Sequence, residues 1–261
     1  MVFDLHNDLF TSDLSPAQQA QTLRATRDTV VYAFWTTEMH TPMNVIRSSL
    51  RSHDASPALF AVEDLGFADR ADLQDLCALR PLYCGLTHNY ANGLAGGALA
   101  SGTLTAFGKT AVRLLNDARI AIDGAHLNRE SFYKAADCAD RLIVSHTGWE
   151  TFCSHPRNLT DEQARIVLER GGIIGLAAVR DFIGGNDVQT YIRLIDSFVQ
   201  TFGAKGVCIG TDFYGTRPLE GLRGYEDFTA VADGLSSRGY TQEDIDAILF
   251  QNAMMYFHSK E

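Results

Sequence analysis

The sequence contains no Cys-x-x-Cys pair, and its five cysteines are odd in number. A disulfide framework or a metal site made of thiolates is therefore not indicated. The cysteines lie mostly in apolar runs, so we expect them to be reduced packing residues. They are Cys77, Cys84, Cys138, Cys153 and Cys208.

Basic patches and long apolar runs are also missing. Acidic residues are scattered along the chain and give a formal net charge of -10. This argues against nucleic acid or an anionic membrane surface as a partner and favours a small polar substrate. No segment reaches the ~18 consecutive apolar residues of a membrane span, and the N-terminus lacks the features of a signal peptide. We expect a soluble, cytoplasmic protein.

The chain has no linker that would divide it, and its 261 residues match the ~250 residues of one barrel domain. Short β-rich runs alternate with amphipathic helical patterns about eight times, which favours a parallel sheet with helical crossovers. A doubly wound open sheet is the competing fold, but it usually has a glycine-rich turn after the first strand. His6-Asn7-Asp8-Leu9 contains no glycine. We therefore predict a single α/β domain over residues 1–261, a (β/α)8 TIM barrel.

The expected strands are the apolar, β-branched runs at residues 2–8, 29–35, 58–62, 82–88, 120–126, 142–146, 173–178 and 207–212. Helical patterns follow at about 16–24, 42–52, 69–79, 105–118, 129–137 and 189–202. Thr160 and Thr241 are expected to cap two further helices. Most of the strands end in an ionisable residue, and in a barrel the strand ends of one face carry the catalytic groups.

The first strand carries His6 and Asp8, whose side chains point to the same face because they are two residues apart. Such a pair occurs by chance, and taken singly His88 or His126 reads more readily as a satisfied buried histidine. The set as a whole favours a metal, since buried carboxylates at one barrel mouth repel each other unless cations accompany them. The set consists of His6, Asp8, Glu63, His88, His126, His146 and Asp212.

The chain contains the motifs His6-Asn7-Asp8-Leu9, Leu86-Thr87-His88-Asn89, Asp123-Gly124-Ala125-His126, Ser145-His146, Arg157-Asn158 and Gly210-Thr211-Asp212-Phe213. These motifs resemble those of the membrane (renal) dipeptidases and their bacterial relatives, which are binuclear zinc barrels. They occur in the family's order over nearly the whole chain. The resemblance implies that His6 and Asp8 bind one zinc, that Glu63 bridges to a second, and that His126 and His146 complete it. It also implies substrate contacts from His88 and Arg157 and proton transfer by Asp212.

The chemistry of these residues fits the resemblance. Imidazole and carboxylate suit Zn²⁺, and a shared carboxylate allows two ions ~3.5–4 Å apart with a bridging hydroxide. Asp212 would take the proton of the attacking water and pass it to the leaving amine. His88 would donate to the developing oxyanion, and Arg157 would pair with a substrate carboxylate.

We therefore expect an enzyme, a zinc-dependent dipeptidase with two Zn²⁺ ions that hydrolyses small dipeptides, with a D-residue at the C-terminal position as one option. Two alternatives stay open: a metal-dependent hydrolase of a specialised amide or lactam on the same barrel, and an inactive relative that only binds a metal or peptide. The sequence leaves the natural substrate, its stereochemistry, the cellular metal and the oligomeric state open, a homodimer included.

The chain also departs from the family pattern. Tyr214 replaces a second aspartate near the end of the eighth strand, and Phe182 replaces a tyrosine that helps to bind the substrate carboxylate. Arg180 is a candidate to compensate. His155 has no role in the family pattern, and we interpret it as a loop-packing residue or a support for the site. The segments around 9–28 and 63–68 are shorter than in most members, which leaves specificity open.

Overall fold

Eight parallel strands follow one another in chain order around a closed barrel, and helices alternate with them. The computed structural model describes residues 1–35, 42–52 and 59–258. The predicted (β/α)8 fold is confirmed. The strands are β1 Phe3–Asn7, β2 Thr29–Phe34, β3 Phe60–Val62, β4 Tyr83–Gly85, β5 Ala121–Asp123, β6 Leu142–Thr147, β7 Ile174–Leu176 and β8 Val207–Ile209.

Helices connect these strands at most of the expected places. The α-helices are α1 Pro16–Ala25, α2 Pro42–Ser52, α3 Arg70–Leu79, α4 Ala106–Asp117, α5 Arg129–Cys138, α6 Asp161–Glu169, α7 Arg180–Ile183, α8 Val188–Phe202, α9 Phe228–Ser236, α10 Gln242–Asp246 and α11 Asn252–His258. The short 3-10 helices are η1 Leu9–Thr11 and η2 Tyr225–Asp227, and η3 Ala247–Gln251 is π-helical. Thr160 and Thr241 cap α6 and α10 as predicted, each in a capping box.

Contacts between residues divide the chain into two compact units, which we describe separately. Unit 1 consists of Met1–Asn7, Thr26–Val30 and Val144–Glu261, and unit 2 of Asp8–Ala25 and Val31–Ile143. The expectation of a single domain over residues 1–261 stays a prediction.

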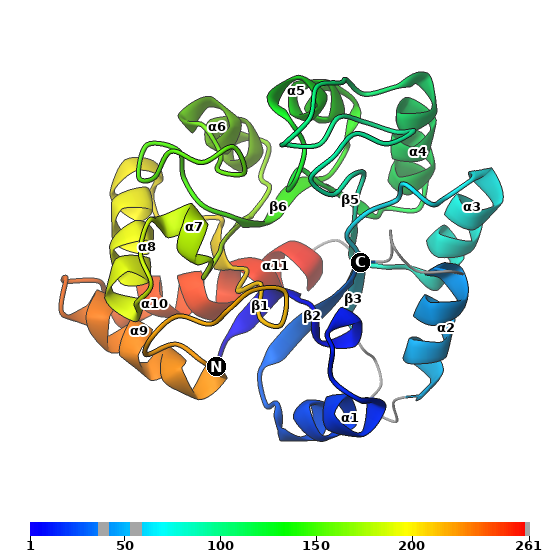
Figure 1. Ribbon diagram of the computed structural model, residues 1–261. Helices are drawn as coiled ribbons and strands as arrows, with labels where there is room; N and C mark the ends of the chain where they lie inside the picture. The colour runs from blue at the N-terminus through cyan, green and yellow to red at the C-terminus, as the bar shows by residue number, and fades with distance from the viewer. Residues whose placement is uncertain (36–41, 53–58, 259–261) are drawn as a thin grey trace. The chain divides into compact units, whose positions relative to one another are not determined.

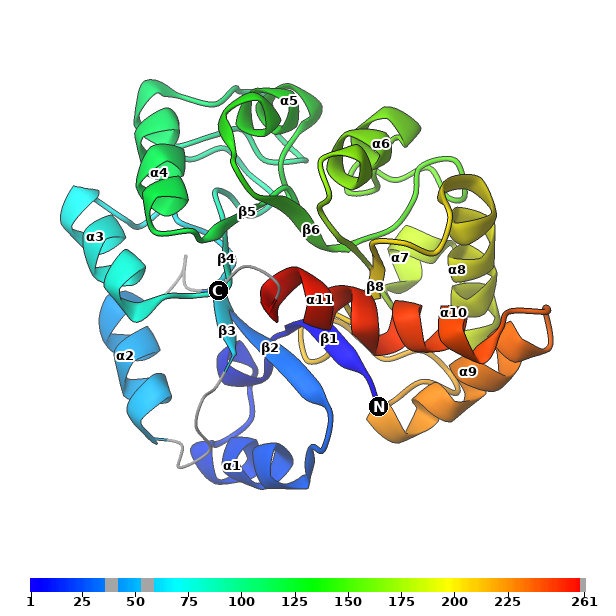
Figure 2. The ribbon, with the colours of Figure 1, turned by 180° about the vertical axis from the view of Figure 1, so that it is seen from behind.

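In unit 1, β8 pairs with both β1 and β7. Figure 2 shows α10 and α11 within one continuous stretch of chain, and η3 and α11 pack against β1 and β8. Phe3 of β1 lies against Phe250 and Phe257, with ring centroids 6.1 Å and 6.0 Å away. This apolar contact anchors the strand that ends in the predicted metal ligands.

The part of β6 that belongs to unit 1, residues 144–147, contains a bulge. Val144 pairs with Ile174 and Thr147 with Leu176, so three steps along β6 match two along β7. The extra residue lies in the segment Ser145-His146. Gly175 and Gly210 make room for it, because a Cβ atom at either position would collide with the carbonyl oxygen of Ser145. Bulges of this kind redirect side chains near functional sites.

In unit 2, residues 31–34 of β2 and strands β3 to β5 pair in chain order, with Phe34 opposite Val62 and Cys84 opposite Ile122. Figure 1 shows α3, α4 and α5 following one another along this unit, and α4 packs against both neighbours. Gly85 allows β4 to approach the end of β3, since a Cβ there would collide with the carbonyl oxygen of Glu63. The glycine therefore helps to fix the backbone position of Glu63, the first residue after β3.

Several strands are shorter than the sequence predicted. The ladders of β5 and β8 stop at Asp123 and Ile209, so that His126 and Asp212 lie in the turns beyond them. At both residues φ is positive, 64° and 61°, and this left-handed backbone cannot continue a strand. The predicted residues are thus presented by turns at the strand ends.

All five cysteines are free, and Cys84 and Cys208 are buried. Burial raises the pKa of both thiols well above the ordinary value, which favours the unreactive protonated form. Within the described residues, no helix has the length and apolar character that a bilayer crossing requires.

Candidate metal centre

Glu63 and His126 form the tightest contact among the predicted ligands of unit 2. Glu63 is the first residue after β3, and its Oε1 lies 2.8 Å from Nε2 of His126. The side chains are only 7% and 6% exposed, so water does little to screen this pair. A carboxylate and an imidazole from two different strand ends therefore meet in a buried place.

The other ring nitrogen of His126 settles how the ring is oriented. Nδ1 lies 2.9 Å from the amide oxygen Oδ1 of Asn89, which can only accept, so Nδ1 carries the proton. A neutral His126 then directs the lone pair of Nε2 at the Glu63 carboxylate. Two acceptors facing each other require either a further proton or a cation between them. Histidines that bind metals usually have this arrangement, with the distal N–H donated to a fixed acceptor.

His88 lies beside this pair. Its ring centroid is 4.3 Å from that of His126 and 4.9 Å from that of Trp35. One ligand atom each from Glu63, His88 and His126 lie within 4.8 Å of one another. The geometry therefore allows His88 to serve either as the predicted donor or as a third ligand.

In unit 1, the rings of His6 and His146 lie close together, with centroids 3.9 Å apart and their planes tilted by 37°. Both are buried. The hydroxyl of Ser145 lies 2.9 Å from Nδ1 of His146 and 3.4 Å from Nδ1 of His6. One hydroxyl thus orients both rings through their Nδ1 atoms.

Arg157 also contacts His146. Its Nη2 lies 2.9 Å from Nε2 of His146, and because a guanidinium can only donate, Nε2 accepts this hydrogen bond. A metal bound at the same nitrogen would compete with Arg157 for one lone pair. The predicted roles of these two residues therefore require Arg157 to turn away when His146 binds a metal.

Asp212 lies next to His6, and their ligand atoms are within 4.8 Å of each other. Its backbone N–H donates to the carbonyl oxygen of His6 at 3.1 Å. Asp8 follows β1 directly and is buried, as its predicted role as a ligand beside His6 requires.

A buried carboxylate supports this end of β1 and β8. Asp4 accepts hydrogen bonds from the Thr211 hydroxyl at 2.6 Å, the Thr211 N–H at 2.8 Å and the Tyr225 hydroxyl at 2.6 Å. Burial raises the pKa of Asp4 to about 6, and these hydrogen bonds limit the rise. The network fixes Thr211, the residue before Asp212.

Phe182 and His155 surround Arg157. The Arg157 guanidinium lies 5.3 Å from the ring centroid of Phe182, so the ring face supports the charge even though it lacks a hydroxyl. His155 Nδ1 accepts the backbone N–H of Arg157 at 3.2 Å, and its ring packs against Phe182. His155 is thus a loop-packing residue that holds Arg157, in line with its interpretation from the sequence.

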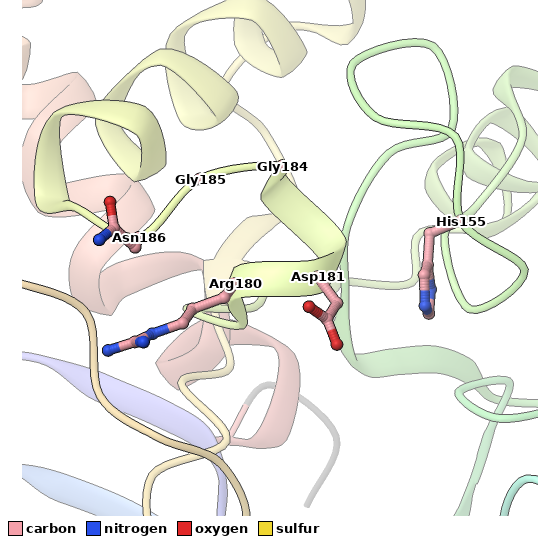
Figure 3. Close-up of a pocket in the computed structure, with 6 residues that line it drawn as sticks. All are labelled: His155, Arg180, Asp181, Gly184, Gly185 and Asn186. Carbon is pink, nitrogen blue, oxygen red and sulfur yellow. The ribbon is translucent and has the colours of Figure 1, made fainter.

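Arg180 lies in an open hollow of about 620 Å³ with His155, Asp181, Gly184, Gly185 and Asn186. Its Nη2 donates to the carbonyl oxygen of Pro218 at 2.8 Å. In Figure 3 the Asp181 carboxylate lies between Arg180 and His155, and the Arg180 guanidinium extends away from His155. The side chain that we considered as a substitute for the missing tyrosine is therefore engaged elsewhere.

The donor set fits a divalent transition metal. It consists of imidazole nitrogens and carboxylate oxygens, without thiolate, which suits Zn²⁺. Ligand atoms on one tetrahedral ion with bonds of ~2.0–2.1 Å lie ~3.3 Å apart, so an ion between Glu63 and His126 needs only a slight opening of that pair.

Sequence reasoning gave no role to the residues that orient the ligands. Asn89 follows His88, and Ser145 precedes His146, so both stand inside motifs that were already visible. Asp4 shares the face of His6 two residues earlier on β1. The sequence signal for Asp4 was its place at an alternating polar position of a strand whose other residues are mostly apolar.

Comparison with known proteins relates most of the chain to one family. A model of the membrane dipeptidase family (Peptidase family M19) matches residues 4–261. An uncharacterized protein of the pqqA 5′ region of Klebsiella pneumoniae is 30% identical over 157 residues, covering 57% of this chain and 58% of that protein. An uncharacterized dipeptidase of Schizosaccharomyces pombe is 24% identical over 272 residues, covering 86% of this chain and 65% of that protein. The chain thus spans less than two thirds of the length of either relative.

Solved structures match over nearly the whole chain. An amidohydrolase from Pseudomonas aeruginosa aligns with a TM-score of 0.85 at 18% identity, covering 98% of this chain and 95% of that one. A metallopeptidase from Rhodobacter sphaeroides, holding a phosphinate mimic of the dipeptide L-Ala-D-Ala, aligns with a TM-score of 0.78 at 18% identity, covering 97% of both chains. At a sequence identity of 18%, the structural similarity establishes the shared fold and nothing further.

Proposed function

Because the chain belongs to the membrane dipeptidase family, peptidase family M19, we propose that it is a metal-dependent dipeptidase. The observation that carries the proposal is the buried contact of His126 Nε2 with the Glu63 carboxylate, in which Asn89 holds the proton on the opposite nitrogen. That arrangement presents a lone pair and a carboxylate to one point, as a metal requires. Family membership alone would not indicate that this chain has kept its ligands.

We propose that two Zn²⁺ ions are held, one by His6 and Asp8 and the other by His126 and His146, with Glu63 shared. When bound, such ions supply a nucleophilic water near neutral pH and polarise the scissile carbonyl. The protein contributes ligand orientation. Ser145 and Asn89 fix the rings of His146 and His126, so each ring offers its Nε2 atom.

The remaining residues bind the substrate and move its protons. Asp212 would accept the proton of the attacking water and return it to the leaving amine. His88 would donate a hydrogen bond to the carbonyl oxygen as negative charge develops there. Arg157, supported by the Phe182 ring, would pair with the free carboxylate of the substrate and so limit the substrate to dipeptides.

We further propose that the C-terminal residue of the substrate can be a D-residue. The support is the phosphinate mimic of L-Ala-D-Ala that the Rhodobacter sphaeroides metallopeptidase holds on the same fold.

The test combines metal content with turnover of a dipeptide panel. We expect two divalent ions per chain, cleavage of L-Ala-D-Ala, and little cleavage of its C-terminal amide. Substituting Arg157→Ala should reduce cleavage of the acid much more than cleavage of the amide. Equal cleavage of acid and amide by the wild type would exclude the carboxylate clamp and favour a specialised amide as substrate. A fully active preparation with one ion or none would exclude the binuclear centre.

A further inference from the structure

Trp35 lies at the end of β2 and contacts the candidate site, although nothing in the proposed mechanism uses it. Its ring lies 4.9 Å from the ring of His88, which in turn lies 4.3 Å from His126. All of these residues belong to unit 2. The indole thus contacts the histidine that lies beside the Glu63–His126 pair.

The indole N–H of Trp35 is buried and has no hydrogen-bond partner among residues 1–35, 42–52 and 59–258. Buried N–H groups are nearly always satisfied, so an orphan at a candidate site indicates a donor intended for a ligand or a water. Trp149, the other tryptophan of the chain, is buried too, but its Nε1 donates to Asp161 Oδ1 at 2.8 Å.

We propose that Trp35 is a substrate-binding residue whose indole N–H donates to an oxygen of the bound dipeptide, next to the oxygen served by His88. An indole N–H can only donate, so its partner must be a carbonyl or carboxylate oxygen. The inference rests on the proposed dipeptidase function and adds a specificity contact to it. The half-buried ring also packs against the His88 imidazole.

The first test separates the N–H from the ring. Trp35→Phe keeps an aromatic face for His88 and removes only the donor. We expect KM for L-Ala-D-Ala to rise roughly tenfold while kcat stays within about twofold, because a contact made equally in ground and transition states affects binding alone. Metal content should not change. Trp149→Phe is the matched control and should leave KM and kcat within about twofold.

The second test has a readout besides activity. In Trp149→Phe, Trp35 is the sole tryptophan, so its fluorescence reports on the site. Titration with the phosphinate mimic of L-Ala-D-Ala should shift or quench this emission in a saturable way. In Trp35→Phe the emission of Trp149 should not respond.

The outcomes separate the two claims. If the wild type cleaves dipeptides but Trp35→Phe matches it in KM, the ring only supports His88 and the Trp35 proposal is wrong. The proposal would also be wrong if the Trp35 emission did not change at a saturating concentration of the phosphinate mimic. If the wild type neither cleaves nor binds any dipeptide, the proposed function fails first and the Trp35 contact fails with it.

Discussion

Within the described residues, three non-glycine residues in the segments that follow β5 and β8 have left-handed backbone. They are His126, Asp212 and Tyr214, with φ values of 64°, 61° and 70°. Each such residue costs of order 1–3 kcal/mol unless its surroundings enforce the conformation, and such residues concentrate at functional sites. Two of the three are residues to which the sequence had assigned a chemical role.

Asp212→Asn is a clean test of proton transfer, since asparagine tolerates the left-handed conformation as well as aspartate does. We expect turnover to fall by roughly 10²–10⁴-fold, because the amide cannot accept the proton. Melting temperature and metal content should stay near those of the wild type. Retention of more than about a tenth of the rate would show that another group is the base.

His155 should make the Arg157 loop sensitive to acid. Burial, and then the charge of Arg157, lower the pKa of His155 below its ordinary value of 6.5, while Asp181 opposes the shift. The folded protein therefore binds this proton less readily than the unfolded chain. The contribution of neutral His155 to the free energy of unfolding is therefore fully present above about pH 6.5. It is lost as the pH falls through the pKa that His155 has in the folded protein.

The measurement is melting temperature between about pH 7 and pH 5 for the wild type and His155→Gln. The wild type should lose more stability on acidification, because protonation of Nδ1 removes the acceptor for the Arg157 N–H. Identical profiles for the two proteins would show that His155 does not carry the effect.

Among the elements, α6 depends on its capping box. The Thr160 hydroxyl accepts the backbone N–H of Gln163, and the Gln163 side chain accepts the N–H of Thr160. Thr160→Ala should lower the free energy of unfolding by about 1 kcal/mol, measured by urea denaturation. Thr160→Ser keeps the hydroxyl and should stay close to the wild type. An equal loss in both variants would point to the methyl group instead.

Gly85 couples strand packing to the site. Gly85→Ala places a Cβ against the carbonyl oxygen of Glu63, and backbone cannot yield as a flexible side chain does. We expect a loss of about 1–3 kcal/mol of stability together with reduced metal content, because Glu63 moves. Gly93→Ala, in the connection after β4, meets nothing within 4 Å and is the control. If Gly85→Ala keeps full metal occupancy, the position of Glu63 does not determine metal binding.

The elements were largely predictable because apolar runs and capping residues are local signals. The exceptions also have local causes. The predicted strands ran through His126 and Asp212, since composition does not reveal the sign of φ. No prediction covered Phe228–Ser236, which forms α9 and contains Gly234, a poor helix former.

The partners of the site residues could not be read from the chain. His6 meets the hydroxyl of Ser145 across 139 positions, and Asn7 donates to the Tyr225 hydroxyl across 218. Only the folded backbone brings such pairs together. The resemblance to a family supplied the expected ligands, but it carried no information on the groups that orient them.

For the molecule as a whole, metal removal should lower stability. A cation that binds only the folded state at ~100 times its Kd adds ~2.7 kcal/mol, which corresponds to about 5–10 °C in melting temperature for a chain of this size. We expect a chelator to lower the melting temperature by that amount and zinc to restore it. Calcium or magnesium at the same concentration is the control. If the chelator left the melting temperature unchanged, the proposal that buried carboxylates hold a metal would be contradicted.

The bulge in β6 has a consequence for any change in chain length. In a regular strand Ser145 and His146 would face opposite sides of the sheet, and their side chains could not meet. The extra residue lets the two neighbours hydrogen-bond to each other at 2.9 Å. A chain from which Ser145 is deleted could still pair Val144 with Ile174 and Thr147 with Leu176 without a gap. Such a protein would have an unbroken sheet, but His146 would lose the hydroxyl that orients it. The presence of this one residue thus determines whether β6 only completes the barrel or also orients a predicted metal ligand.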